Sequence, residues 1–600
     1  MGISFRVGLP RRRKIAFNWF AALVCCALVA SPSAQAKSFD QTSLPSSGAS
    51  DYQRGLAAYA HGNLATARAA FDKAVSADPK NADAQNMLAQ VLLRLREVDQ
   101  AIAHLEQALE VRPTMAAARI ALGQAYEIKG EMDPAVVELR RAVEFSPNNA
   151  EAHRELGRAL SLERKTGEAV AELHLALRLA PQRPELHDEL GSLLAQESKF
   201  EPAATEFRRA IGLNPQFEKA YLHLGVALVA SGDLSGAAKQ LEHAVQLDPR
   251  DATAWFYHGS VEESLGDREA AMHSYQRVDG ITPSMPDLQR RMGLLYQRRG
   301  DVDQAETAFH QALQQTPDNP EVHNSLALTL LQRGDGDGAV REFQRAIELR
   351  PDDASFQGNL GTAYLQKADF ESAIAQFRAA LKMTPDAANL HYDLALALKL
   401  KDDLPAAIAE WKESLRLDPN LADAHYSLGV TLWQSGDFPA AVEQLREVTQ
   451  IQPQYAEAYY TLGTVYKQMK KYPESEEALR KAIELEPDLA GAHTTLASVL
   501  RQLGKDEAAE VEAKAGAQLS QEKTSLQAAT FATNSGKRLL ANGDLDGAIS
   551  QFRSAISSVP TYALAHYQLA VALARQGQKD EAAREFQKAS ELDSHLVPPR

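Results

Sequence analysis

Histidines are the side chains in this sequence that could most readily bind a metal or transfer a proton. The chain contains 16 of them. A metal site brings three or four ligands together, and a general base needs a partner within hydrogen-bonding distance. Seven of the histidines instead stand 34 or more residues apart, which favours a structural role in packing: His153, His187, His323, His391, His425, His493 and His566.

Other residue patterns associated with catalysis or cofactor binding are missing from the sequence. The segment Gly334–Gly338 resembles a calcium-binding loop, but it lacks the spaced acids and the closing glutamate. No HExxH, Walker A, GxSxG or dinucleotide-binding fingerprint is present. We therefore predict no metal site, no cofactor and no enzymatic activity.

The N-terminus has the features of a secretory signal peptide. A basic run, residues 11–14, precedes a short apolar stretch at 15–30, and Ala34-Gln35-Ala36 supplies the small residues of a cleavage site before Lys37. The sequence therefore predicts an exported protein, periplasmic or secreted after cleavage near Ala36. One alternative is an uncleaved segment that anchors the chain in the inner membrane. A lipoprotein signal is a weaker alternative, since Cys25 stands where a small residue is wanted. A twin-arginine signal is another, since the residues that usually follow its arginines are missing.

Composition narrows the classes of partner and of covalent chemistry. The only cysteines, Cys25 and Cys26, lie within the apolar stretch, so disulfides and thiolate sites are not expected in the folded part. The formal net charge is −15, and the first 36 residues contribute five basic and no acidic residues. An acidic chain repels phosphate backbones, which argues against a nucleic-acid partner.

A proline recurs every 34 residues through most of the chain, and such a period indicates a repeat protein. One further proline, Pro560, follows after an interruption. The unbroken series is Pro79, Pro113, Pro147, Pro181, Pro215, Pro249, Pro283, Pro317, Pro351, Pro385, Pro419, Pro453 and Pro487. When each repeat starts 31 residues before its proline, the first begins at residue 48. Position 8 is then glycine or alanine in all sixteen repeats, and position 20 is alanine in fifteen.

These columns predict two packed helices in each repeat. Positions 4, 7, 8 and 11 share one face of a first helix, and positions 20, 24 and 27 share one face of a second. Small residues at positions 8, 20 and 27 let the helix axes approach one another. Position 15 is glycine in ten repeats, which predicts a left-handed residue at the end of the first helix. The proline at position 32 ends the second helix.

The columns resemble those of tetratricopeptide-repeat (TPR) proteins, whose pattern is W-x2-L-G-x2-Y, then A-x3-F, then A and P. Repeat 3 carries this pattern as Leu122, Gly123, Tyr126, Ala135, Leu139, Ala142 and Pro147. Repeat 10 carries it as Leu360, Gly361, Tyr364, Ala373, Phe377, Ala380 and Pro385. The resemblance covers roughly residues 48–597. It implies an all-α fold, a right-handed superhelical solenoid of about sixteen stacked antiparallel helix pairs.

The register of the repeats divides the chain. We expect a signal peptide at 1–36, a flexible linker at 37–47, repeats 1–14 at 48–523, a joint at 524–528, and repeats 15–16 at 529–597. The joint is expected because Gln521 replaces the proline of repeat 14 and about five extra residues follow. Repeats 15 and 16 are therefore expected to form a terminal segment at a different angle.

The resemblance also implies a binding surface, because TPR solenoids bind partners along a concave face that positions 2, 5, 9, 12 and 13 line. The lysines and asparagines of the carboxylate-clamp type are missing from positions 5 and 9. Sugar transferases have an asparagine ladder at position 6, where Asn359 is nearly alone here. One cluster does stand out at positions 5 and 12 of repeats 11–14, which lie two turns apart on one helix face. Its members are Tyr392, Tyr426, Tyr460, Lys399, Trp433, Lys467 and Arg501.

Aromatic and cationic side chains dominate binding hot spots, so this cluster is a hypothetical site for an extended peptide or a glycan. The alternative is that the tyrosines pack between adjacent first helices. A second hypothetical patch for an acidic segment is formed by Arg290, Arg291 and Arg298, together with Arg299. The alternative is that neighbouring acids pair with these arginines.

The sequence as a whole predicts a non-enzymatic protein–protein interaction scaffold of the cell envelope that binds protein or peptide partners. Two alternatives stay open: an adaptor for polysaccharide export or outer-membrane assembly, and a TPR regulatory subunit of an enzyme complex. A spacer without a specific ligand is a third. A membrane is expected as a partner only if the N-terminal segment is retained.

Overall fold

The computed structural model describes residues 47–597, and the predicted signal peptide and most of the linker lie outside that range. All 31 helices of the described part are α-helices, and no strand occurs among these residues. The chain divides into two compact units, Met1–Pro317 and Asp318–Arg600. The division falls between repeats 8 and 9. The 34-residue period continues through it unchanged, so the sequence pattern does not mark it.

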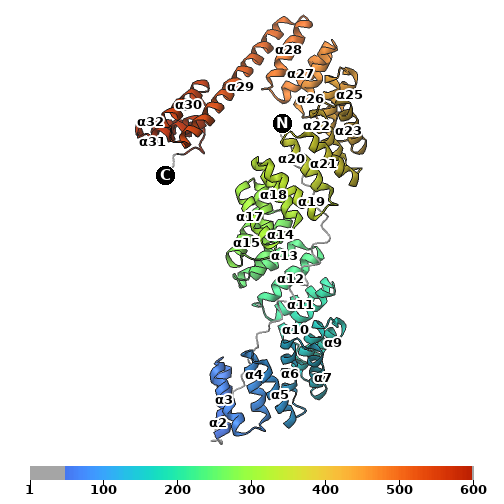
Figure 1. Ribbon diagram of the computed structural model, residues 1–600, viewed down its shortest axis with the longest axis vertical. Coiled ribbons are helices and arrows are strands. Elements are labelled where there is room, and N and C mark those ends of the chain that lie inside the picture. The colour runs from blue at the N-terminus through green and yellow to red at the C-terminus, as the bar shows by residue number, and fades with distance from the viewer. Residues whose placement is uncertain (1–46, 598–600) are drawn as a thin grey trace. The chain divides into compact units, whose positions relative to one another are not determined.

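In the first unit, eight repeats each supply a first and a second helix (Figure 1). The first helices are α2 (Ser47–Ala60), α4 (Ala82–Arg94), α6 (Ala116–Lys129), α8 (Ala150–Leu162), α10 (Pro184–Gln196), α12 (Glu218–Ser231), α14 (Ala252–Leu265) and α16 (Leu288–Arg299). The second helices are α3 (Leu64–Ala77), α5 (Val98–Val111), α7 (Met132–Phe145), α9 (Thr166–Leu179), α11 (Phe200–Leu213), α13 (Leu234–Leu247), α15 (Arg268–Ile281) and α17 (Val302–Gln315).

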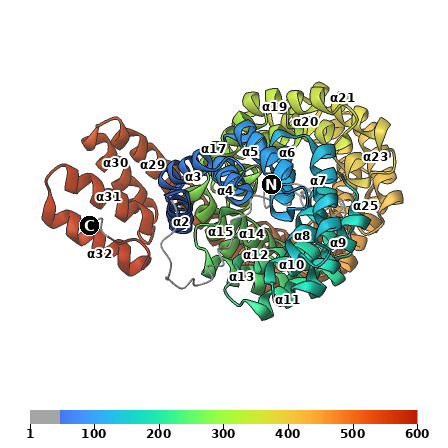
Figure 2. The same ribbon diagram turned by 90° about the horizontal axis from the view of Figure 1, so that it is seen from below.

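The second unit continues the same alternation. Its first helices are α18 (Pro320–Arg333), α20 (Ala354–Gln366), α22 (Ala388–Leu400), α24 (Ala422–Gln434), α26 (Ala456–Gln468), α28 (Ala490–Gln502) and α31 (Ala563–Arg575). Its second helices are α19 (Gly336–Leu349), α21 (Phe370–Met383), α23 (Leu404–Leu417), α25 (Phe438–Ile451), α27 (Tyr472–Leu485), α30 (Leu545–Ser558) and α32 (Lys579–Leu592). In Figure 2 the second helices α19, α21, α23 and α25 follow one another along the outer edge of this unit.

One helix, α29 (Asp506–Ala541), combines the second helix of repeat 14 with the first helix of repeat 15 (Figure 1). A joint was expected at 524–528, but the structure has an uninterrupted helix of 36 residues there. The reason is the missing proline: with Gln521 at position 32, nothing stops the second helix, and residues 517–532 contain no glycine or proline. Ala509 and Gly516 of α29 are buried toward one end, and Ala529, Ala532 and Leu540 toward the other.

Most repeats bury the columns that the sequence predicted. In repeat 10, Ala373, Phe377 and Ala380 of the second helix have no exposed surface. The glycine at position 8 is required here, because a Cβ atom on Gly361 would lie 2.7 Å from the Phe377 ring. Neighbouring repeats stack these faces into continuous apolar clusters, which a single helix pair could not form alone.

The histidines of position 4 connect the helices of each repeat rather than forming a site. The Nδ1 atom of each ring lies 2.5 to 2.8 Å from a Glu or Gln side chain 19 residues later, on the second helix. In five of them the Nε2–H group donates to the carbonyl oxygen of the preceding position-32 proline, as His493 does to Pro487 at 2.9 Å. Trp255 donates to Pro249 in the same way.

Candidate functional site

The three tyrosines of position 5 lie on consecutive first helices, Tyr392 on α22, Tyr426 on α24 and Tyr460 on α26. Each hydroxyl reaches the next first helix. Tyr426 Oη lies 3.3 Å from Thr461 Oγ1, and Tyr392 hydrogen-bonds to Ser427. The Tyr460 hydroxyl lies 2.9 Å from the place that a Cβ on Gly491 would take. The tyrosines therefore pack between adjacent first helices, and we call this series the tyrosine ladder.

The tyrosine ladder is half-buried, so each ring has both a packed part and an exposed part. Burial raises the pKa of Tyr392 above its ordinary value. The Tyr426 ring also contacts Tyr455, with 5.2 Å between the ring centroids, and burial raises the pKa of Tyr455 to about 12. The hydrogen bonds of the Tyr392 and Tyr426 hydroxyls hold these two rings in fixed positions.

The residues of position 12 do not form a single cationic row beside the ladder. Trp433 is half-buried, and its Nε1–H donates to Gln468 Oε1 of the next repeat at 2.8 Å. Lys399 turns toward the core, since its Nζ lies 5.8 Å from the ring centroid of the buried Trp411, and burial lowers its pKa. Lys467 is half-buried and Arg501 is exposed, in the last turns of α26 and α28.

The arginines of repeat 8 are occupied by neighbouring groups. Arg290 pairs with Asp287 in its own helix turn. Arg291 donates to Glu263 Oε2 at 3.0 Å and to the Tyr275 hydroxyl at 3.3 Å. Arg299 pairs with Asp301, whereas Arg298 is exposed. Three of the four arginines of this patch therefore have their charge matched within the protein.

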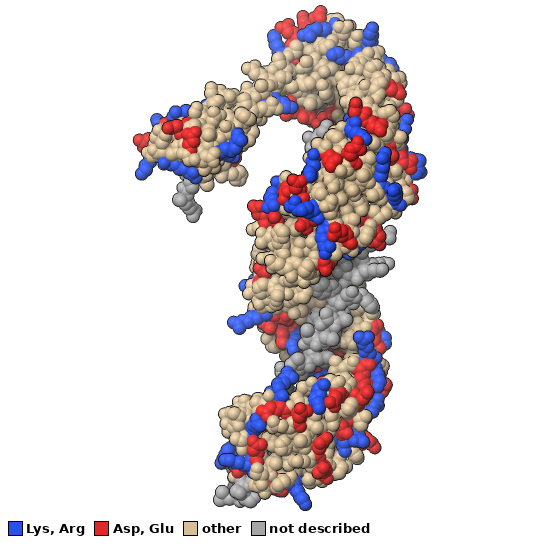
Figure 3. All heavy atoms as spheres, viewed as in Figure 1, with Lys and Arg blue, Asp and Glu red and all other residues tan. Residues whose placement is uncertain are grey.

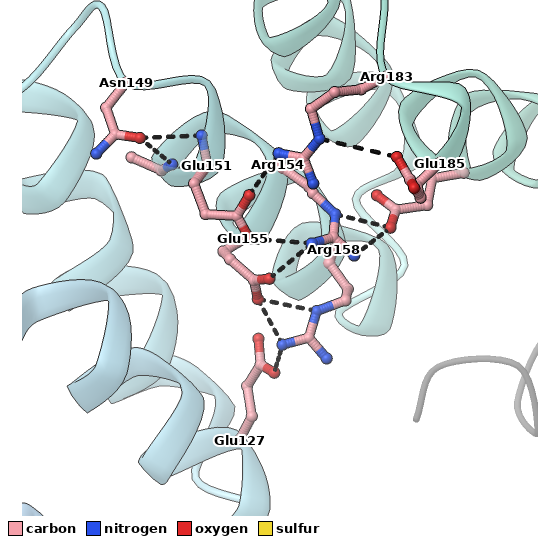
Figure 4. Close-up of polar contacts among 10 residues, drawn as sticks. Glu127, Asn149, Glu151, Arg154, Glu155, Arg158, Arg183 and Glu185 are labelled. Carbon is pink, nitrogen blue, oxygen red and sulfur yellow. Dashed lines mark hydrogen bonds and ion pairs between the residues drawn. The ribbon is translucent and has the colours of Figure 1, made fainter. Parts of the chain in front are cut away.

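Sequence reasoning missed a network of buried charges on the first helices of repeats 3–5 (Figure 4). Arg154 donates to Glu189 Oε1 at 2.6 and 2.8 Å, and to Glu151 Oε1 at 3.0 Å. The side chain of Arg158 connects Glu155 with Glu127, and its Nη2 lies 2.6 Å from a carboxylate oxygen of each. Arg183 extends the network by donating to Glu151 Oε2 at 2.7 Å.

This network contains more carboxylates than guanidinium groups, and two oxygens lack partners among the described residues. These oxygens are Glu127 Oε1 and Glu189 Oε2. Burial raises the pKa of Glu127 to about 7, against the opposing effect of Arg158. A sequence signal existed, because Arg154, Glu155 and Arg158 fill positions 5, 6 and 9 of one repeat, and most other repeats have uncharged residues there. The partners, however, lie in repeats 3 and 5, and only stacking brings them together.

The described residues contain no group of three or more potential ligands that could hold a metal ion. The segment Gly334–Gly338 has a structural explanation: Asp335 caps α19 by accepting a hydrogen bond from the Gly338 N–H at 2.9 Å, and Asp337 pairs with Lys367. On the face of the molecule seen in Figure 3, basic and acidic side chains are interspersed. No helix in the described part of the chain is apolar over a length sufficient to span a membrane.

Family models agree with the helix pairs and their glycine, alanine and proline columns. A tetratricopeptide-repeat model matches residues 52–104, 86–150, 189–249, 224–286, 290–354 and 533–595. Three related repeat models match residues 399–436 and 432–470, 456–489, and 330–392. These matches together cover well over half of the chain. The chain is a tetratricopeptide-repeat protein. TPR stacks present extended binding surfaces, so membership supports a scaffold that binds protein partners rather than a catalytic fold.

Several solved structures are similar to parts of this TPR chain. The MamA protein is 23% identical, with a TM-score of 0.27, over 29% of this chain and 94% of that chain. Pseudomonas aeruginosa pilF is 23% identical, with a TM-score of 0.32, over 35% and 95%. YrrB, described as a TPR protein with an unusual peptide-binding site, is 22% identical, with a TM-score of 0.28, over 31% and 96%. No curated protein sequence matches the chain significantly.

Proposed function

We propose that this TPR protein is an exported scaffold that binds a protein partner on the first helices of repeats 11–13. The observation that carries the proposal is the tyrosine ladder, which places three half-buried aromatic rings on consecutive first helices. Trp433 adds a fourth aromatic side chain on α24, held by its hydrogen bond to Gln468.

The physical basis of the proposal is that the rings are fixed before a partner arrives. Large aromatic side chains supply much contact area with few rotatable bonds, and they dominate binding hot spots. The contacts of the ladder with Ser427, Thr461 and α28 reduce the rotamer freedom that would otherwise be lost on binding. An extended segment could therefore bind across three repeats with many small contacts.

Affinity capture with cross-linking from envelope extracts tests this proposal. The full chain is compared with a Tyr392/Tyr426/Tyr460→Leu variant, in which leucine keeps apolar bulk between the first helices. A matched control, Tyr364/Tyr466→Leu, alters two tyrosines of position 11 in the same unit. We expect a partner that is captured by the parent and the control and is lost with the ladder variant, provided that all three have equal helicity.

Two other outcomes of the capture distinguish the alternatives. If the ladder variant captures the same partner as the parent, the scaffold function stands but its binding surface lies elsewhere. If no version captures a specific protein, the proposal of a scaffold fails and the spacer alternative is favoured. The identity of a captured partner would separate an export or assembly adaptor from a subunit of an enzyme complex.

The proposed location in the periplasm or outside the cell rests on the basic and apolar N-terminal pattern and on the small residues Ala34 and Ala36. These residues lie outside the described part of the chain. N-terminal sequencing of the protein from envelope fractions is expected to begin at Lys37. An intact Met1 on membrane-associated protein would instead support the uncleaved anchor.

A further inference from the structure

A regular contact joins consecutive first helices, from position 5 of one repeat to position 6 of the next, 35 residues later. In the second unit, Asn359 Nδ2 donates to Asn324 Oδ1 at 2.8 Å, and the tyrosine ladder reaches Ser427 and Thr461 at the same offset. The first unit shows the same step in Arg154 with Glu189 and in Asp188 with His223. In these five pairs the side chain at position 5 gives the polar group at position 6 a hydrogen-bonding partner.

One step of this series in the second unit is incomplete. Position 5 of repeat 10 is Gly358 and position 6 of repeat 11 is Asp393. Gly358 has no side chain with which to reach Asp393. The two first helices also approach closely here, because a Cβ atom on Gly358 would lie 2.9 Å from Leu390 Cδ2 of α22. Position 5 of repeat 10 therefore offers no hydrogen-bonding group to Asp393, and the movable end of the Leu390 side chain lies where such a group would begin.

Asp393 is consequently a partly buried carboxyl group without a partner. No hydrogen bond or ion pair involves its side chain in the described part of the chain, and burial is the one cause that shifts its pKa, which it raises to about 7. Elsewhere in this protein, buried carboxylates such as Glu155 and Glu189 are paired with arginines. A buried carboxylate is unfavourable unless a cation or a donor compensates it.

We propose that Asp393, opposite Gly358, binds the side chain of a lysine or arginine of the protein partner. This inference rests on the proposed function, because Asp393 directly follows Tyr392 of the tyrosine ladder on α22. A basic side chain would bring the donor that Gly358 cannot supply, while its aliphatic stem packs on aromatic surface. Local charge favours a cation, since Asp423 also lies close enough to Tyr392 to raise the pKa of that tyrosine.

The test uses fluorescein-labelled nonapeptides in a positional-scanning library whose central residue is fixed as Arg, Lys, Leu or Glu. Binding to the full chain is measured by fluorescence anisotropy. We expect the Arg and Lys sublibraries to bind at least tenfold more tightly than the Leu and Glu sublibraries. In Asp393→Asn, which keeps the side-chain shape, this preference is expected to fall below twofold.

A second variant blocks the site without altering the carboxyl group. Gly358→Asn supplies the amide that Asn324 supplies one repeat earlier, and its Cβ atom would meet only the flexible end of Leu390. We expect it to lose the basic preference as well. Asp423→Asn is the matched control, because it removes an exposed carboxylate from the next first helix and should keep at least half of the preference.

The outcomes separate this inference from the proposed function. Equal binding of all four sublibraries, or a basic preference that survives in Asp393→Asn and Gly358→Asn, overturns the inference and leaves the ladder as a binding surface. A loss of the preference in the control as large as in Asp393→Asn would also overturn it, because general electrostatics would then explain the selectivity. Failure of the proposed function is seen separately, as partner capture that does not depend on the tyrosine ladder.

Discussion

At the scale of single residues, the carboxyl group of Asp393 should make the stability of the second unit depend on pH. Burial raises its pKa from an ordinary 3.8 to about 7 in the folded protein. Between these values the folded state holds a proton that the unfolded state has lost, so stability falls as pH rises from about 4 to 7 and then levels off. Asp393→Asn removes this dependence and should be more stable than the parent by at most about 4 kcal/mol above pH 7, since one pKa unit corresponds to about 1.36 kcal/mol.

Hydrogen exchange of the α20–α24 amides at pH 8 and in acid measures this difference locally. The variant should exchange more slowly than the parent at pH 8, after correction for intrinsic rates, and the two should converge near pH 4. Equal protection at both pH values would mean that Asp393 is compensated by water or by a group of the chain. A basic peptide bound to the parent should reduce the difference, because binding stabilises the native state in proportion to its affinity.

The residues of the candidate site illustrate what a single sequence can and cannot predict. The tyrosine column was visible because three identical residues share one repeat position, yet their contacts with Ser427 and Thr461 became apparent only in the structure. Asp393 looked like one acid among many. It has no partner because Gly358, 35 residues earlier, has no side chain. This relation can be seen only once the contact between consecutive first helices is known. The partners of Arg158 were hidden for the same reason.

At the scale of the helices, the end of each first helix was predicted well. All sixteen residues at position 15 have a positive φ, between 57° and 92°, which confirms the left-handed residue expected from the glycine column. Six of them are not glycine: Arg96, Arg164, Ser198, Ala368, Asp402 and Lys470. A residue with a Cβ atom costs roughly 1 kcal/mol or more in this conformation, so the stacked helices on either side impose it.

This strain predicts that glycine stabilises the turn after α26. Lys470 is exposed with a φ of 62°. Lys470→Gly should stabilise the α26–α27 hairpin by about 0.5 to 1 kcal/mol, the relief of strain being partly offset by the greater freedom of glycine in the unfolded chain. Thermal unfolding and hydrogen exchange at the turn measure the gain. The reciprocal variant, Gly504→Ala after α28, where φ is 71°, should lose about 1 kcal/mol, and a gain in both variants would contradict the explanation.

The helix α29 marks the limit of prediction at this scale. The same proline rule that located thirteen helix ends also explains why this helix continues where Gln521 replaces proline. The sequence showed the loss of register but not its consequence. A missing proline gives the same sequence pattern whether the helix continues or a distorted joint forms. Most residues between 517 and 528 are exposed, so the middle of α29 depends on helix propensity and on its packed ends.

At the scale of the whole molecule, stability should be local, because within each of the two units a repeat contacts chiefly its neighbours. The charge network of repeats 3–5 offers a test. Arg158→Met leaves Glu127 and Glu155 without their shared cation in a site where both are nearly inaccessible. Breaking a buried pair in this way typically costs about 3 to 5 kcal/mol. We expect faster hydrogen exchange in α6, α8 and α10, with no change in α18–α32.

The pH dependence of this variant follows from Glu127, whose pKa burial already raises to about 7 in the parent. Without Arg158 the carboxyl group holds its proton more strongly, so the variant should approach the parent at pH 5 and be weakest at pH 8. Arg141→Met is the matched control, since Arg141 is half-exposed and its pair with Glu138 should contribute less than about 1 kcal/mol. If Arg158→Met instead speeds exchange throughout α18–α32, the sixteen repeats unfold as one cooperative body, and a partner bound at repeats 11–13 would be sensitive to changes far along the chain.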